Sequence, residues 1–299
     1  MKNWFILFLA LLLGSASTIA VQKIRKKKKP TRNIALNIAV KAEQIEVQKK
    51  FVVLVPSYNN SKYCKKNLES IFAQKYSNFR ILYFEDASLD DTLVKVTDLI
   101  QSSGKKNIEL IHNPKNMGAL YNIYTGTHMC DDDEIIVILD GDDHFASDYV
   151  LSNLNAYYNN PDVWLTYGQF VDYPNYNIGF NVPIDMEDLK EARLRDMTWR
   201  TSHLRTYYAA LFKNISVEDL KYEGKFLEAT YDVAMMLPMI EMAREHVFFT
   251  PDVFYIYNDE NPISDSKVKR KKQLFYDQYI RSKPKYNKIN SLFEERESA

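Results

Sequence analysis

Residues 134–143 read EIIVILDGDD, a continuous apolar run that ends abruptly in carboxylates. A run this short and this apolar is typical of a strand that is buried on both faces of a sheet. Similar runs lie at residues 51–55 (FVVLV), 80–84 (RILYF) and 108–111 (IELI), and segments with helical spacing separate them. This alternation predicts an α/β fold with a mostly parallel, doubly wound sheet and helices on both faces.

The composition is that of a globular protein. Of the 299 residues, 46% are hydrophobic and 26% are charged, with only 8 Gly and 10 Pro. Such a chain is too apolar to be disordered and too poor in glycine to be fibrous. Its two cysteines, Cys64 and Cys130, are too few for a disulfide framework or a four-ligand zinc site, so we expect free thiols.

A net charge of zero conceals two oppositely charged parts. Residues 1–50 carry 11 Lys/Arg against 2 Glu, whereas residues 51–299 carry 28 Lys/Arg against 37 Asp/Glu. The acidic body argues against nucleic-acid binding, which needs a basic footprint. A basic arm beside an apolar segment suits an anionic membrane surface instead. The alternative for the lysine run is a solvated charge cluster without a lipid role.

The N-terminal segment has the composition of a membrane anchor. Residues 4–21 contain no charge, six Lys/Arg follow within residues 23–29, and only Lys2 stands in front. Because positive charge is retained on the cytoplasmic side, we expect residues 1–22 to act as a single-pass signal-anchor with a cytoplasmic body. Small residues near Ala20 leave a cleaved signal peptide, and therefore secretion, as the alternative.

Polar residues follow the apolar runs where the predicted strands end. Residues 56–60 read PSYNN, residues 85–88 read EDAS, and residues 140–143 read DGDD. In open α/β sheets, ligands bind at the carboxyl ends of the strands. We therefore expect these three segments to meet at one binding edge.

The sequence excludes two common ways in which this edge could hold a phosphate group. Neither G-x-G-x-x-G nor G-x-x-x-x-G-K-S/T occurs in the chain, which excludes the dinucleotide fingerprint and the Walker loop. Asp140, Asp142 and Asp143 supply hard oxygen ligands that suit Mg²⁺ or Mn²⁺, and such an ion can carry a diphosphate. The alternative is an acidic turn in front of a helix that starts near residues 147–148.

Four ordered segments resemble those of the family 2 glycosyltransferases: residues 55–59 (VPSYN), 85–88 (EDAS), 116–119 (NMGA) and 139–143 (LDGDD). The resemblance covers about residues 51–260. It implies a GT-A fold, in which a nucleoside-diphosphate sugar lies across the carboxyl edge of the sheet and Mn²⁺ or Mg²⁺ neutralises its phosphates. It also implies inverting transfer, with a UDP-sugar as the expected donor and a glycan, a lipid-linked group or a protein as the acceptor.

The resemblance implies roles for individual residues. Tyr58 would flank the nucleobase and Asp86 would accept a hydrogen bond from it, which agrees with the imide N–H and the flat face of uracil. Asp140 would be the ribose-side member of the D-x-D motif, and Asp142 the metal ligand. At Glu85 the family more often has a second Asp. The same motifs add four residues to the expected nucleotide-sugar site: Pro56, Asn116, Gly118 and Gly141.

The catalytic base is expected at the start of a later apolar helix. Residues 230–236 read TYDVAMM, at the place where the family usually has Glu-Asp, and Tyr231 replaces the Glu. Asp232 is therefore the predicted general base, because apolar neighbours raise the pKa of a carboxyl group and make it a better proton acceptor near neutrality. The alternative is an Asp that only stabilises the helix start, with the base then at a residue such as Glu228.

His203 and Arg205 are further candidates for contacts with the acceptor or the diphosphate. They precede a predicted aromatic-rich helix at about residues 207–212, in the half of the body expected to bind the acceptor. A lone histidine is more often structural than functional.

These expectations divide the chain into four parts: an anchor or signal segment (1–22), a basic linker helix (23–50), a GT-A domain (51–265, with a nucleotide-sugar half at 51–150 and an acceptor half at 151–265) and a helical tail (266–299).

A nucleotidyltransferase is the alternative enzyme, but it should carry a loop rich in Gly, Arg or Lys after the first strand. An inactive protein that binds a sugar nucleotide or a glycan is the alternative outside enzymes.

Overall fold

The structure is a computed structural model that describes residues 47–293. The predicted anchor and most of the predicted linker helix lie outside the described residues, and residues 47–50 are irregular. Residues 48–293 form one compact unit. Within the described part of the chain, no helix is both long and apolar enough to cross a membrane.

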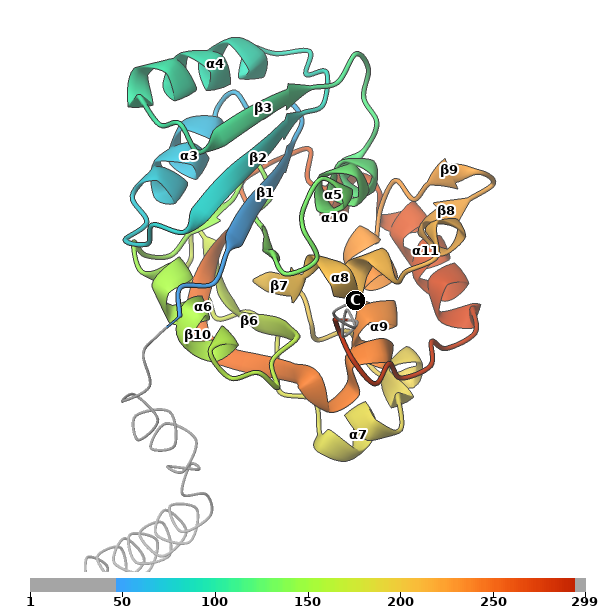
Figure 1. The fold of residues 1–299 in the computed structure, drawn as a ribbon. Coiled ribbons are helices and arrows are strands. Elements are labelled where there is room, and N and C mark those ends of the chain that lie inside the picture. Colours follow the sequence, from blue (N-terminus) through green and yellow to red (C-terminus); the bar gives the residue numbers. More distant parts are fainter. Residues whose placement is uncertain (1–46, 294–299) are drawn as a thin grey trace, which may run out of the picture. The chain divides into compact units, whose positions relative to one another are not determined.

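An eight-stranded mixed sheet runs through this unit (Figure 1). Its strand order is β3-β2-β1-β4-β7-β6-β10-β5. The strands are β1 (Phe51–Ser57), β2 (Phe79–Glu85), β3 (Ile108–His112), β4 (Ile135–Ile138), β5 (His144–Phe145), β6 (Leu165–Tyr173), β7 (Arg205–Tyr208) and β10 (Val247–Asn258). Only β7 and β5 run against the others, so the α/β prediction is confirmed, with a mixed sheet.

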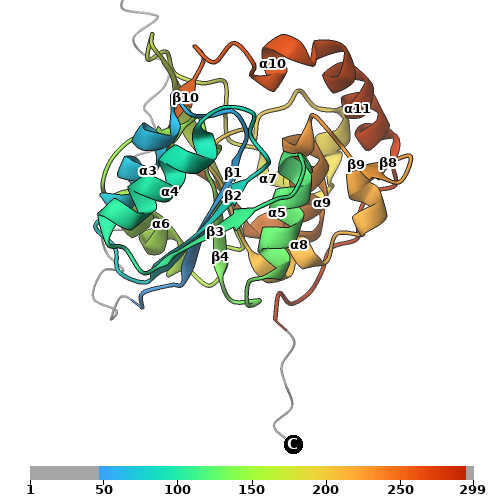
Figure 2. The same ribbon diagram turned by 90° about the horizontal axis from the view of Figure 1, so that it is seen from above.

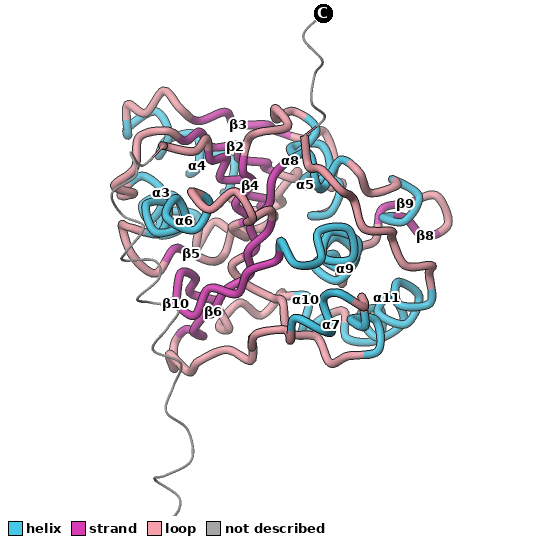
Figure 3. The backbone as a smooth tube through the Cα atoms, turned by 60° about the horizontal axis from the view of Figure 1, so that its bottom comes forward, coloured by secondary structure: helices cyan, strands magenta, loops and turns pink. Residues whose placement is uncertain are grey.

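Helices cover both faces of the sheet, as Figures 2 and 3 show. One face carries α3 (Cys64–Phe72), α4 (Thr92–Ser103) and α6 (Val150–Tyr158), and the other carries α5 (Ala119–His128), α8 (Ala209–Lys213) and α9 (Tyr231–Ala243). The remaining elements are α7 (Met186–Lys190), α10 (Asp265–Val268), α11 (Arg270–Ser282), the hairpin β8 (Lys221–Tyr222) and β9 (Lys225–Phe226), and the 3₁₀ turns η1 (Arg193–Asp196), η2 (Val217–Leu220) and η3 (Arg244–His246). Double coverage explains why all seven residues of β1 are buried.

The segment around Arg205 differs from the prediction. The prediction of an aromatic-rich helix at residues 207–212 is wrong in its first half. Residues 205–208 form β7, and α8 begins after them at Ala209. Strand β7 pairs antiparallel with β4 on one side and with β6 on the other. All four of its residues are buried, so tertiary pairing overrides the apparent helical spacing.

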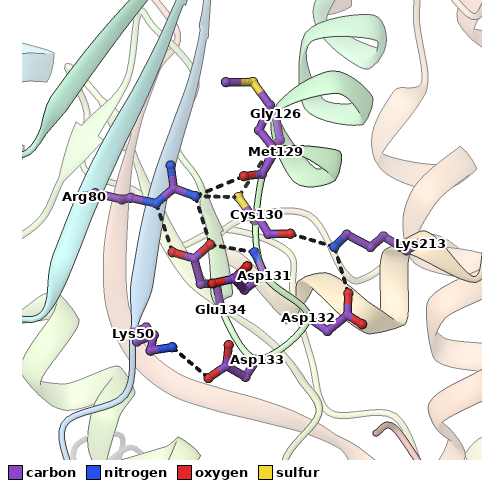
Figure 4. Close-up of polar contacts among 10 residues, drawn as sticks. All are labelled: Lys50, Arg80, Gly126, Met129, Cys130, Asp131, Asp132, Asp133, Glu134 and Lys213. Carbon is purple, nitrogen blue, oxygen red and sulfur yellow. Dashed lines mark hydrogen bonds and ion pairs between the residues drawn. The ribbon is translucent and has the colours of Figure 1, made fainter. Parts of the chain in front are cut away.

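A polar network fixes the turn between α5 and β4, at the edge of the sheet where β1, β2 and β4 begin (Figure 4). Arg80 donates to both carboxylate oxygens of Glu134, at 2.9 and 2.8 Å, and Glu134 accepts the backbone N–H of Asp131 at 2.8 Å. Lys213 pairs with Asp132 at 2.7 Å. The acidic run at residues 131–134 is therefore occupied in holding this turn.

Both cysteines are free thiols, as predicted, and both are buried. Burial raises the pKa of the Cys64 thiol, and it raises the pKa of Cys130 to about 12. Both groups are therefore protonated thiols at neutral pH and react poorly.

Candidate active site

A cleft of about 1860 Å³ opens where β1, β2 and β4 end. Its walls contain every residue predicted for catalysis, donor binding or metal binding: Pro56, Tyr58, Asp86, Asn116, Gly118, Asp140, Gly141, Asp142, His203, Arg205 and Asp232. Parallel strands deliver their carboxyl ends to the same edge, which is why segments far apart in the chain meet here.

Asp140 lines the cleft two residues after the end of β4. Its carboxylate accepts the hydroxyl of Tyr231 at 2.8 Å and the guanidinium of Arg205 at 3.2 Å. The hydroxyl of Tyr255 lies 3.2 Å from the same carboxylate. Three elements, β7, α9 and β10, therefore orient one side chain, of which 16% is exposed.

Asp142 and Asp143 point to different partners. Asp143 is buried and accepts the backbone N–H of Asn258 at 2.6 Å and the hydroxyl of Tyr255. Burial, together with the neighbouring carboxylates, raises the pKa of Asp143 well above its usual range. Asp142 is partly exposed and accepts the side-chain amide of Asn261 at 2.7 Å.

Gly141 allows the D-x-D turn to lie against the end of β1. Its backbone N–H donates to the carbonyl of Pro56 at 3.0 Å. A Cβ atom at this position would lie 2.6 Å from Ser57 and 2.7 Å from Asn60. Any larger residue would therefore force this turn, or the Ser57 and Asn60 side chains, to move.

A divalent cation fits part of this cluster. One ligand atom each from Asp140, Asp143 and His203 lie within 4.8 Å of one another. Nδ1 of His203 is buried without a hydrogen-bond partner. Burial and the Arg205 cation lower the pKa of His203 well below its usual value, so the ring is neutral and can offer a lone pair. Two carboxylates and a neutral imidazole are a donor set for a divalent metal.

The sequence predicts Asp142 as the metal ligand. Asp142 lines the cleft, but it is not one of the three residues whose ligand atoms lie together. Asp143 was expected only as one of the oxygen donors of the acidic turn, without a role of its own. Nothing in the local sequence pairs His203 with the aspartates, because β7 brings it there only through its pairing with β4.

Asp86 lines the cleft although it is largely buried, and it organises the NMGA segment. One carboxylate oxygen accepts the Asn113 side chain at 2.7 Å and the backbone N–H of Met117 at 2.8 Å, and the other accepts the backbone N–H of Gly118 at 2.8 Å. A carboxylate has about four acceptor positions, so one remains for a ligand. Gly118 has φ +88°, a conformation that favours glycine.

Asp232 lies in the first turn of α9, where the sequence places it, and is partly buried. Burial raises its pKa, while the Arg205 cation acts in the opposite direction. Glu228 is a poorer base, because its ion pair with Lys272 lowers its pKa. The cleft also has aromatic walls that the sequence motifs do not indicate: Tyr121, Phe170 and Trp199.

Comparison with known proteins agrees with this architecture. The profile of the family described as "Glycosyl transferase family 2" matches residues 52–220. A relative from Methanococcus voltae, a dolichyl N-acetyl-α-D-glucosaminyl phosphate 3-β-D-2,3-diacetamido-2,3-dideoxy-β-D-glucuronosyltransferase, is 28% identical over 107 residues, 35% of this chain and 33% of the relative. The chain matches only about a third of the length of its curated relatives.

Two solved structures share the fold. S. aureus TarS 1–349 in complex with UDP-GlcNAc has a TM-score of 0.52 at 20% identity, over 70% of this chain and 58% of TarS. The mannosyltransferase PcManGT from Pyrobaculum calidifontis, in complex with GDP-Man and Mn²⁺, has a TM-score of 0.54 at 16% identity, over 84% of this chain and 71% of PcManGT.

Proposed function

Because the chain belongs to glycosyl transferase family 2, we propose that it moves a sugar from a nucleoside-diphosphate donor to an acceptor hydroxyl. The observation that carries this proposal is the meeting of the D-x-D turn with the carboxyl group of Asp232 in one cleft. The family profile ends before Asp232, so the presence of this residue in the cleft is an observation of the structure beyond the matched residues.

The donor proposed is a UDP-sugar. Tyr58 lines the cleft and offers an aromatic face, and Asp86 retains one acceptor position for an imide N–H. Uracil and guanine both carry an imide-type N–H beside a carbonyl group. Both bases occur in complexes of proteins with this fold: TarS binds UDP-GlcNAc, and PcManGT binds GDP-Man.

The metal proposed is Mn²⁺ or Mg²⁺, held by Asp140, Asp143 and His203, with Asp142 beside them. When bound, such an ion would neutralise the charge that develops on the diphosphate leaving group. Arg205 is buried next to Asp140 and adds a fixed positive charge on the same side of the cleft.

In the proposed reaction, the acceptor oxygen attacks the anomeric carbon from the face opposite the nucleoside diphosphate. The new carbon–oxygen bond forms as the bond to the phosphate oxygen breaks, which inverts the configuration. Asp232 takes the hydroxyl proton, and the nucleoside diphosphate leaves with the bonding electrons. A raised pKa suits Asp232 to this role, because a stronger base removes the proton more readily.

The acceptor and the location of the chain are also proposals. We infer a glycan, a lipid-linked group or a protein as the acceptor, and the M. voltae relative is named for a dolichyl-phosphate-linked acceptor. Residues 1–22 would anchor the chain with its body on the cytoplasmic side, and secretion after signal cleavage is the alternative.

The deciding experiment is a donor-hydrolysis screen with the full chain, because hydrolysis requires no known acceptor. UDP-sugars should be hydrolysed in Mn²⁺ and spared in EDTA, and GDP-sugars serve as the comparison. Asp142→Asn should lower hydrolysis with the fold intact, because this side chain is partly exposed at the cleft and lies next to Asp143, one of the three proposed ligands. Tight nucleotide binding without hydrolysis of any donor would support the inactive binding protein, and hydrolysis that continues in EDTA would contradict the metal.

A further inference from the structure

Exposed apolar side chains border the mouth of the cleft. Ile178 is 66% exposed and Phe180 is 58% exposed, while Val268 and Leu274, which line another part of the same cleft, are 58% and 53% exposed. Isolated apolar residues on a surface are ordinary, but several around one opening mark an interaction site.

The outer face of α11 continues this apolar rim. Lys271, Leu274, Phe275 and Gln278 recur at intervals of three and four, so they share one helix face, and all four are exposed. Phe275 remains 46% exposed although its ring makes an edge contact with Tyr222 at 5.1 Å. Two large apolar side chains are thus held outward by an ordered helix.

The same segment is strongly basic, although the body of the chain is acidic. Residues 267–272 read KVKRKK, which is five cations without a carboxylate. Lys272 pairs with Glu228 and Lys267 pairs with Asp259, so two carboxylates from elsewhere in the chain offset part of this charge. A net positive charge therefore surrounds the exposed apolar residues. Cations flanking apolar side chains are typical of a helix that lies in a membrane interface.

We propose that the face formed by Val268, Lys271, Leu274 and Phe275 docks on an anionic lipid surface. The apolar side chains enter the boundary between headgroups and acyl chains, and the cations lie among the lipid phosphates. A second copy of this chain fits poorly, because a twofold contact would bring the two basic segments together. Docking turns the cleft mouth toward the membrane, so a membrane-borne acceptor would enter there. This route of entry rests on the proposed function, whereas the docking itself does not.

A local probe tests the docking without interference from the N-terminal segment. In the full chain, Leu274→Cys carries an environment-sensitive NBD group, and the native Cys64 and Cys130 are buried and remain unlabelled. Val94→Cys is the matched control, because Val94 is 62% exposed on α4 and outside the cleft lining. Vesicles of phosphatidylcholine with or without phosphatidylglycerol are the ligand.

The NBD emission at position 274 should shift to the blue and intensify with phosphatidylglycerol vesicles, while position 94 stays unchanged. Equal responses at the two positions, or none at position 274 when the protein floats with the vesicles, would overturn the proposal. A shift that appears without vesicles and grows with protein concentration would also overturn it, in favour of self-association.

Two substitutions outside the cleft lining separate docking from donor chemistry. Lys271→Glu and Phe275→Ser should each reduce the vesicle-dependent signal at position 274 by roughly fivefold or more, since each cation near an anionic surface contributes about that factor and burial of a large apolar side chain contributes at least as much. Neither residue lines the cleft, so donor hydrolysis should not change. Full docking by both variants contradicts the proposal, whereas failure of all donor hydrolysis contradicts only the proposed function.

Discussion

Tyr231 donates its hydroxyl to the carboxylate of Asp140 at 2.8 Å, although 91 positions separate the two residues. This contact ties the first turn of α9 to the D-x-D turn after β4. Asp232 follows Tyr231 directly, so the same hydrogen bond fixes the distance between the proposed base and the proposed metal site. The chain has a tyrosine here, where the family usually has a glutamate.

Tyr231→Phe is expected to loosen this link. The substitution leaves an acceptor position of Asp140 unfilled in a partly buried site, which costs about 1 to 3 kcal/mol. Nucleotide binding measured by calorimetry in Mn²⁺ should weaken roughly tenfold. Tyr149→Phe is the control, because Tyr149 is 57% exposed and outside the cleft lining. Unchanged binding would show that Arg205 and Tyr255 orient Asp140 sufficiently by themselves.

Asp232→Asn tests the catalytic base. The variant should bind donor normally and lose transfer by a factor on the order of 10² to 10⁴, because an amide cannot take the acceptor proton. Its melting temperature should stay close to that of the parent protein. If the variant instead unfolds early and the folded fraction transfers sugar at the normal rate, Asp232 only stabilises the helix.

The pH dependence of transfer follows from the same group. A base acts in its deprotonated form, and burial raises the pKa of Asp232. Transfer should therefore fall as the pH drops through a midpoint above the usual aspartate pKa of about 3.9. The profile is measured as kcat with saturating donor and Mn²⁺, and the residual activity of Asp232→Asn should lack this limb. A midpoint at or below about 3.9 would contradict the assignment.

His203→Phe tests the metal site. The ring of His203 stacks on Tyr255 with centroids 4.4 Å apart, and phenylalanine keeps this packing while it removes the nitrogen lone pair. Mn²⁺ affinity, followed by electron paramagnetic resonance without nucleotide, should fall at least roughly tenfold. His246→Phe is the matched control, because His246 stacks on Trp164 at 3.8 Å outside the cleft lining. Equal affinities in the two variants would exclude His203 as a ligand.

Breaking a buried ion pair in the acceptor half is expected to destabilise the protein much more than breaking an exposed one. Arg195 binds both carboxylate oxygens of Glu241, at 2.6 and 2.8 Å, with 5% and 0% of the two side chains exposed. Glu241→Gln leaves the guanidinium buried without a counter-charge and should cost about 3 to 5 kcal/mol in urea unfolding. Glu187→Gln breaks the exposed pair with Arg193 and should cost less than about 1 kcal/mol. Similar losses in both variants would contradict this ranking.

The sequence by itself determined the parallel half of the sheet and the place of the cleft. The apolar runs that became β1, β2, β3 and β4 are recognisable because strands covered on both faces need continuous apolar residues. Because these strands are parallel, their carboxyl ends lie at one edge, and this is enough to place Tyr58, Asp86 and Asp140 at the same edge of the sheet. The prediction that both cysteines are free thiols followed from their number alone.

Only the tertiary structure decided how the cleft is completed. The spacing around Arg205 predicts a helix, yet the gap between β4 and β6 is filled by β7, which brings Arg205 against Asp140. The contacts of Tyr231 and Tyr255 with Asp140 likewise join segments 91 and 115 positions apart. Local periodicity records which face of an element is apolar, but it carries no information about which distant element packs there, because that choice depends on burial and pairing summed over the whole fold.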